Sequence, residues 1–364
     1  MNFVQAARGN NTTTGFDYLR LGLSIAVVCW HSIITSYGPD AAQKAWNSLP
    51  GTAAVFILPM FFSLSGYLVS GSLSRNSVPA FLTLRVVRIV PALFVEILLS
   101  AFLLGPILTK MPIGEYFSSR TFFEYLLNII GYIHYQLPGV FLDNPRAGVV
   151  NASLWTIPFE LECYIAITLI GITKLFRRPN ILAFALIFFT VLALYFSKNS
   201  VDSNAPGVLN GRILVISFLF GVLIYSARDI IPCDGRLALL SAVLAAFLFQ
   251  FRETAYLATI PAAYLTVWIG TTNPRRLPIV FNGDYSYGIY LFAYPIQQTI
   301  AMIPELRHWW INIPLALTFS GLYAAFSWHF IEKPVLVRKN IAVAFVSDFE
   351  TLVRVSLRRL AGGR

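Results

Sequence analysis

The chain has 364 residues, of which 57% are hydrophobic and only 12% are charged, and its mean hydropathy is +0.67. Soluble domains carry about 25% charged residues, so this composition argues against a water-soluble enzyme. The net charge of +10 comes from Lys and Arg in short clusters between apolar blocks, without the basic stripe typical of nucleic-acid binding. We therefore expect one membrane-embedded unit and no nucleic-acid partner.

Ten apolar segments are candidates for helical membrane spans, each of which needs about 20 mostly apolar residues. They are 16–36, 52–70, 88–108, 153–173, 180–197, 212–227, 237–251, 254–271, 284–303 and 310–332. Segment 121–137 is also apolar but carries Glu124, Asn128 and His134, so we place it as an interfacial or re-entrant piece. The predicted fold class is all-α, a polytopic transmembrane helix bundle of about ten spans.

The basic residues predict the orientation of this bundle. With a cytoplasmic N-terminus, 19 of the 27 Lys and Arg residues fall on the inner side, which favours both termini inside. The predicted parts are a polar N-terminal tail (1–13), the transmembrane domain (14–336) and a basic amphipathic tail (337–364) on the lipids of the inner leaflet. The three cysteines are an odd number and form no ligand motif, so neither a disulfide framework nor a metal site is expected.

The first span carries ionisable groups, which are costly at bilayer depth and therefore indicate function. Arg20 and His31 are eleven residues apart, which places both on one helix face about 16 Å from each other. A neutral imidazole can take a proton from a hydroxyl nucleophile near neutral pH, so His31 is a candidate catalytic base. The alternative is a structural histidine that hydrogen-bonds a neighbouring helix.

The fourth span contains Glu160 and Glu162, which point to different faces of a helix. Glu160 lies about 10 Å below the outer surface, near the depth of His31. A carboxylate there could orient the imidazole, as the acid does in a catalytic triad. The alternative is a packing ion pair with a distant Arg.

Arg85 and Arg88 share a face just before the third predicted span. Near a helix N-terminus they would form an anion site for the phosphates of a soluble donor, and Glu332 could neutralise one of them. Anchoring to lipid headgroups explains a single arginine equally well.

The ninth span places Tyr287, Tyr290 and Tyr294 on one face. Such a face can bind a sugar ring or form an aromatic belt at the membrane interface.

Taken together, these motifs resemble the family 3 membrane acyltransferases, which modify polysaccharides, lipopolysaccharide, peptidoglycan and lipochitooligosaccharides. The resemblance covers about residues 14–336 and rests on six ordered motifs. They are Arg20 with His31; 61–68 with Ser65; 85–91 with Arg85 and Arg88; Ser153 and Trp155 with Glu160 and Tyr164; Ser286 with Tyr287, Tyr290 and Pro295; and Trp328 with Glu332.

The resemblance implies an enzyme of the bacterial cytoplasmic membrane. It suggests His31 as the catalytic histidine, Arg20 as its motif partner, and Arg85 and Arg88 as donor-binding residues. We expect Arg20 to bind the donor as well, by meeting its pantetheine or thioester within the bundle. The chain departs from many relatives at Leu161, where they have a second glutamate, and at Ala293, where they have a second histidine.

We therefore predict an O-acyltransferase, most simply an O-acetyltransferase, with acetyl-CoA or another acyl-CoA as co-substrate and no tightly bound cofactor. The acceptor would be a hydroxyl of a surface or secreted glycan or of its lipid-linked precursor, and proteins of polysaccharide biosynthesis are candidate partners. Transfer could be direct or pass through an acyl-histidine. The alternatives are a secondary transporter, although no internal repeat is visible, and a non-catalytic glycan-export protein.

Overall fold

The structure is a computed structural model that describes residues 1–9, 14–199, 210–278, 283–339, 341–344 and 346. Within these residues it contains helices and no β-strand, which confirms the all-α fold class. The longer helices are α2 (Gly15–Tyr37), α4 (Leu49–Leu73), α5 (Val78–Leu99), α9 (Ile157–Ile172), α10 (Pro179–Asn199), α11 (Gly211–Ser226), α12 (Gly235–Leu248), α13 (Ala255–Gly270), α15 (Ser286–Ala301) and α16 (Trp309–Ser327). The shorter ones are α1 (Phe3–Gly9), α3 (Pro39–Trp46), α6 (Gly105–Leu108), α7 (Ile113–Ser118), α8 (Arg120–Leu126) and α17 (Lys333–Val337).

All ten predicted segments are helical, and their boundaries agree with the prediction to within about three residues except at the start of the third. That helix begins at Val78, ten residues earlier than predicted, because the Ser77 side chain caps it by accepting a hydrogen bond from the Ala80 amide. Pro91 then lies inside the helix instead of near its start. Arg85 and Arg88 are thus two turns or more from the helix N-terminus, and the predicted contribution of that terminus to an anion site is wrong.

Five helical stretches of the described chain are long and apolar enough to cross a membrane: Gly15–Tyr37, Leu49–Leu73, Val78–Leu108, Ala152–Ile172 and Pro179–Phe196. Helices α11, α12 and α13 are apolar but shorter. Large apolar side chains are exposed along α10, α12 and α16, as expected for helices that contact lipid. The protein is therefore a multi-pass membrane protein, whereas the number of ten spans and the cytoplasmic position of both ends remain predictions.

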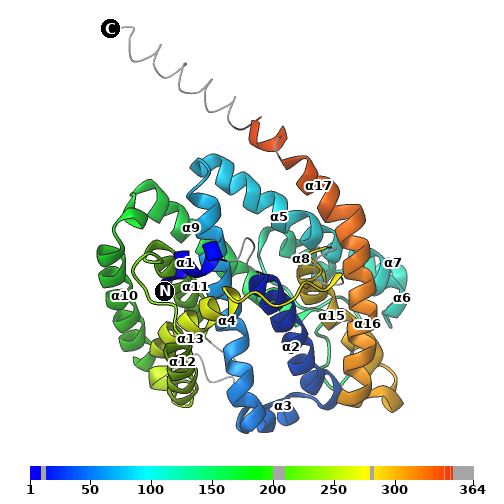
Figure 1. Ribbon diagram of the computed structural model, residues 1–364. Helices are drawn as coiled ribbons and strands as arrows, with labels where there is room; N and C mark the ends of the chain where they lie inside the picture. The colour runs from blue at the N-terminus through cyan, green and yellow to red at the C-terminus, as the bar shows by residue number, and fades with distance from the viewer. Residues whose placement is uncertain (10–13, 200–209, 279–282, 340, 345, 347–364) are drawn as a thin grey trace.

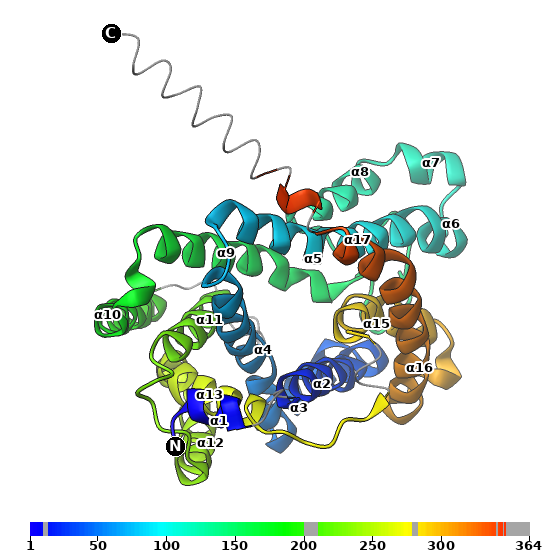
Figure 2. The ribbon, with the colours of Figure 1, turned by 45° about the horizontal axis from the view of Figure 1, so that its top comes forward.

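Helices α2 and α4 stand at the centre of the bundle (Figure 1). Helix α4 packs on α11 and α13 on one side, and α2 packs on α15 and α16 on the other. Helix α5 passes along the edge of this arrangement, where it contacts α4, α9 and α15 (Figure 2). Side chains from α2, α4, α5, α9 and α15 line a common cavity.

Glycines allow the closest approach between two of these helices. A Cβ at Gly66 of α4 would lie 2.0 Å from the Phe218 carbonyl oxygen, and one at Gly221 of α11 would lie 2.1 Å from the Ser63 oxygen. The Ser63 hydroxyl also donates to the Ser217 carbonyl at 3.0 Å. Small residues of this kind let membrane helices pack backbone to backbone, so α4 is held firmly against α11.

The predicted interfacial segment 121–137 is helical only at its start, in α8 and in a 3₁₀ turn at Leu127–Ile130. The buried Asn128 side chain then accepts from the His134 amide and donates to the His134 carbonyl, which folds the chain back on itself. Its position at the interface stays a prediction.

Part of the predicted N-terminal tail forms α1, with Phe3 fully buried. Most of the predicted C-terminal tail (337–364) lies outside the described residues.

Candidate active site

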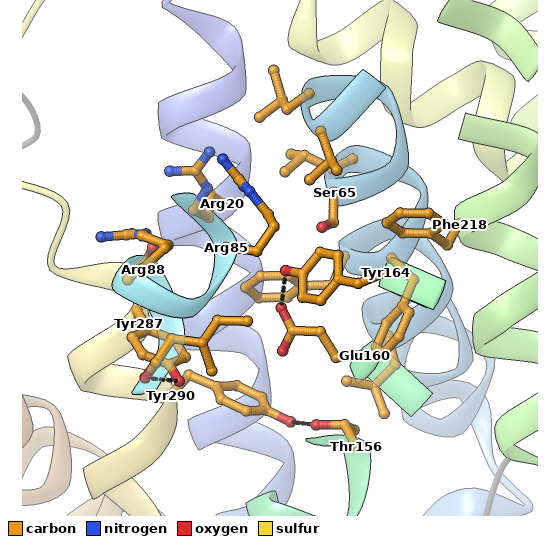
Figure 3. A pocket seen from close by; sticks show the side chains of 18 residues that line it. Arg20, Ser65, Arg85, Arg88, Thr156, Glu160, Tyr164, Phe218, Tyr287 and Tyr290 are labelled. Atoms are coloured by element: carbon orange, nitrogen blue, oxygen red, sulfur yellow. Dashed lines mark hydrogen bonds between the residues drawn. The ribbon is translucent and has the colours of Figure 1, made fainter. Parts of the chain in front are cut away.

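A cavity of about 170 Å³, here called the basic cavity, lies between α2, α4, α5, α9 and α15. Eight of the predicted site residues line it: Arg20, Ser65, Arg85, Arg88, Glu160, Ser286, Tyr287 and Tyr290. The three arginines gather at one end, and Thr156 and Tyr290 lie toward the other (Figure 3). Motifs that are far apart in the sequence thus meet around one space.

Asp284, which the sequence analysis missed as a site residue, ties two of the arginines together. Its Oδ2 lies 2.5 Å from Arg20 Nη1 and also pairs with Arg88 Nη2. Its Oδ1 accepts a hydrogen bond from the Ser286 hydroxyl at 2.6 Å. Arg88 Nη1 lies 3.1 Å from Glu332 Oε2, which confirms the predicted neutralisation of one arginine by that glutamate.

Asp284 lies just before α15 and pairs with one arginine of α2 and one of α5. It therefore joins these two helices to the start of α15.

Arg85 differs from the other two arginines of the basic cavity. It forms no ion pair with any residue that the structure describes, and its Nε is buried without a hydrogen-bond partner. The guanidinium carbon lies 5.7 Å from the centre of the Phe81 ring. Arg85 is thus a cation that remains available to an anionic ligand.

Glu160 lies in the basic cavity and accepts a hydrogen bond from the Tyr164 hydroxyl at 2.6 Å (Figure 3). It does not orient His31 in this structure, contrary to the expectation from their similar depth, because the two side chains point into different cavities. Glu162 points away from both cavities and pairs with Arg212, so the predicted divergence of the two glutamates is confirmed.

His31 lines a second cavity of about 460 Å³, here called the aromatic cavity. Its walls include Trp30, Trp46, Trp155 and Tyr294. The Tyr294 ring meets the imidazole edge-on, with centroids 5.0 Å apart and planes at 83°. Among the described residues the imidazole has no hydrogen-bond partner, so its nitrogens are available to a ligand.

The two cavities adjoin, since Leu58 and Tyr290 line both of them. The Tyr290 hydroxyl lies 2.7 Å from the Thr156 hydroxyl and 3.1 Å from the Ser153 carbonyl oxygen. The predicted tyrosine face therefore follows the interior of the bundle, with Tyr287 in the basic cavity, Tyr290 between the two and Tyr294 in the aromatic cavity. It does not form an interfacial belt.

The turn that carries Ser153 and Trp155 is anchored by Glu96, another residue missed in the sequence. The Asn151 side chain donates to Glu96 Oε1 at 2.9 Å and to the Leu291 carbonyl at 2.8 Å, and it accepts from the Ser153 amide at 3.0 Å. Ser153 is thereby a buried part of the scaffold, and Trp155 reaches the aromatic cavity. Glu96 could have been found by the same signal as Glu160, because it too is a carboxyl group within an apolar segment.

Comparison with known proteins agrees with this arrangement. A sequence profile described as an acyltransferase domain matches residues 13–331. The chain belongs to acyltransferase family 3. No solved structure matches it significantly.

Three relatives are similar to between 80% and 90% of the chain. An O-acetyl transferase of Shigella phage Sf6 is 27% identical over 340 residues, covering 89% of this chain and 96% of the relative. Nodulation protein 10 of Rhizobium leguminosarum bv. viciae is 30% identical over 361 residues, covering 90% of this chain and 95% of the relative. The peptidoglycan O-acetyltransferase OatA of Listeria monocytogenes is 25% identical over 344 residues, covering 80% of this chain and 52% of the relative.

The family assignment makes the protein an acyltransferase, an enzyme, and it thereby disfavours the transporter and the non-catalytic export protein. The fold adds that the family 3 motifs divide between two adjoining cavities. Arginines line one of them, and His31 with aromatic residues lines the other.

Proposed function

We propose that this family 3 enzyme moves an acetyl or similar acyl group from acyl-CoA to a hydroxyl of a glycan. The acceptor is a surface or secreted glycan or its lipid-linked precursor, and the enzyme works in the bacterial cytoplasmic membrane. The observation that carries the proposal is the meeting of the basic and aromatic cavities at Leu58 and Tyr290. A donor on one side and an acceptor on the other would come together at that point.

The donor side fits a charged coenzyme with a narrow arm. A volume of about 170 Å³ lies below the roughly 300–1,000 Å³ of typical ligand pockets, so it suits the pantetheine arm with the nucleotide outside. Arg85 would bind a phosphate, because a guanidinium donates two parallel hydrogen bonds to such an oxyanion. Arg20 and Arg88 are already paired with Asp284 and Glu332, so Arg85 is the arginine of this cavity that would meet the donor's charge.

His31 would perform the proton transfers in the aromatic cavity. One imidazole nitrogen takes the proton of the acceptor hydroxyl as that oxygen bonds to the thioester carbonyl carbon. The carbon–sulfur bond then breaks, and the thiolate of coenzyme A leaves and receives the proton from the imidazolium. In a two-step route the same nitrogen takes the acyl group first and passes it to the acceptor afterwards.

The test is transfer of label from radioactive acetyl-CoA to purified surface glycan, in membranes that contain wild type or His31→Gln. Removal of a general base costs about 10²–10⁴-fold in rate, so we expect His31→Gln to lose nearly all transfer. His329→Gln is the matched control, because that histidine is exposed and lines neither cavity. Full transfer by His31→Gln would refute the catalytic role.

Label that stays on the wild-type protein when no acceptor is present would indicate the two-step route. Absence of any transfer by wild type, with several acyl-CoAs and glycans, would refute the proposed function as a whole.

A further inference from the structure

Arg146 stands between the aromatic cavity and a third cavity of about 430 Å³, here called the loop cavity, which is lined by Glu124, His134 and Gln136 among others. Tyr135, Arg146 and Val149 line both of these cavities. The sequence analysis assigned no role to this arginine. Arg146 therefore places a cation at the boundary between the loop cavity and the cavity that contains His31.

The charge of Arg146 has no compensating carboxylate. Its side chain forms no ion pair with the described residues, and its Nε is buried without a hydrogen-bond partner. The described lining of the aromatic cavity includes no Asp or Glu. Glu124 of the loop cavity pairs instead with Arg120 at 2.6 Å. A partly buried guanidinium without a carboxylate partner is costly, so a ligand anion would be stabilised there.

The backbone of Arg146 is fixed in place before any ligand binds. The buried Gln298 side chain of α15 donates to the carbonyl oxygens of Arg146 at 2.7 Å and Val149 at 2.6 Å. The Asn144 side chain donates in turn to the Gln298 carbonyl at 2.7 Å. Because α15 also carries Tyr294, which packs on His31, Arg146 and His31 are held by one helix. This preorganisation lowers the cost of binding a ligand.

The rest of the aromatic cavity suits a saccharide. Trp30 and Trp46 meet edge to face at 5.5 Å, and Trp155 and Tyr135 complete an aromatic lining. Such rings combine apolar faces with polar edges, which suits the C–H faces and hydroxyls of a sugar. Neutral sugars need no cation for this, so Arg146 indicates a further group on the acceptor.

We propose that Arg146 binds a negatively charged group of the saccharide acceptor while one of its hydroxyls faces His31. The group is an oxyanion attached to the sugar, either the carboxylate of an acidic sugar or the phosphate of a lipid carrier. This inference rests on the proposed acyl transfer to a glycan and specifies the chemistry of its acceptor.

The test uses the full chain in lipid nanodiscs, radioactive acetyl-CoA and two matched pairs of acceptors. The first pair is a short oligosaccharide with a uronic acid and the same oligosaccharide with its carboxyl reduced to the alcohol. The second pair is a saccharide on a polyprenyl phosphate and the corresponding polyprenyl glycoside without phosphate. We compare wild type, Arg146→Gln, Arg146→Lys and the control Lys110→Gln, whose exposed charge pairs with Asp143.

For wild type we expect a KM about tenfold or more lower for the charged member of one pair, since a hydrogen bond to a charged group contributes that much. Arg146→Gln should remove this difference by raising the KM of the charged acceptor alone, with unchanged kcat on the neutral one. Arg146→Lys should keep part of the difference and Lys110→Gln all of it. The pair that responds identifies the carboxylate or the phosphate as the source.

Equal KM values within both pairs for wild type would overturn the inference and leave the proposed function intact. An equal loss of kcat on charged and neutral acceptors in Arg146→Gln would also overturn it, because the arginine would then act on the reaction or the fold. Absence of transfer by wild type to all four acceptors would refute the inference together with the proposed function.

Discussion

The basic and aromatic cavities adjoin but are built in opposite ways. In the basic cavity Asp284 lies between Arg20 and Arg88, and Glu332 lies beside Arg88. Among the described residues that line it, Arg85 and Glu160 are outside these ion pairs. In the aromatic cavity the polar side chains of His31 and Arg146 have no ionic partners among the described residues. Ion pairs thus stabilise the basic cavity, where Arg85 remains available to a ligand. In the aromatic cavity the groups that would react or bind are not paired with an opposite charge.

This difference between the two cavities indicates that charged side chains inside the protein serve two purposes. The arginines of α2 and α5 pair with Asp284, just before α15, and with Glu332, just before α17. These pairs hold the helices at fixed positions, because every member is compensated. Groups without partners are the ones that a ligand has to complete. Replacing a residue of each kind should therefore have different consequences.

The largest expected effect comes from Asp284→Asn, which removes the carboxylate shared by Arg20 and Arg88. Breaking such a pair leaves charge uncompensated, at a cost of about 3–5 kcal/mol for fully buried pairs, and the side chain is 23% exposed. We expect a loss near 3 kcal/mol, measured as a lower unfolding temperature in detergent. Asp143→Asn, which breaks an exposed pair with Lys110, should cost less than about 1 kcal/mol. Equal stability of the two variants would contradict the bracing role.

A smaller effect, confined to the donor, is expected for Arg85→Gln. Loss of a charge-assisted contact to phosphate should raise the KM for acetyl-CoA about tenfold or more and leave the unfolding temperature nearly unchanged. Steady-state kinetics with varied acetyl-CoA measures this, and Arg212→Gln, an exposed arginine on another surface, is the control. A large drop in stability with an unchanged KM would instead show that Arg85 stabilises the helix packing and does not bind the donor.

The smallest effect is expected for Glu160→Gln. If Glu160 oriented His31 as the acid of a triad does, its replacement would cost about 10⁴-fold in kcat. Because it contacts Tyr164 in the basic cavity instead, we expect less than a tenfold change in kcat. Tyr164→Phe, which removes the partner of the same hydrogen bond, should behave alike. A loss of several orders of magnitude in kcat for Glu160→Gln alone would contradict this and indicate that Glu160 orients His31.

Composition and spacing were sufficient for everything that depends on a single helix. The low charge indicated a membrane protein, and the apolar segments located ten helices, with one early start that a serine cap explains. Periodicity also put Tyr287, Tyr290 and Tyr294 on one face, which the structure confirms. These properties follow from 3.6 residues per turn and 1.5 Å per residue, and both are local.

Only the tertiary structure decided which side chains meet. Glu160 and His31 share a similar predicted depth but face different cavities, because the rotation of each helix about its axis is set by packing such as that of Gly66 against α11. Asp284 reaches two arginines from distant segments, and Arg146 comes to the His31 cavity through a loop held by Gln298. Sequence spacing fixes depth along one helix, whereas contacts between helices depend on how all of them pack together.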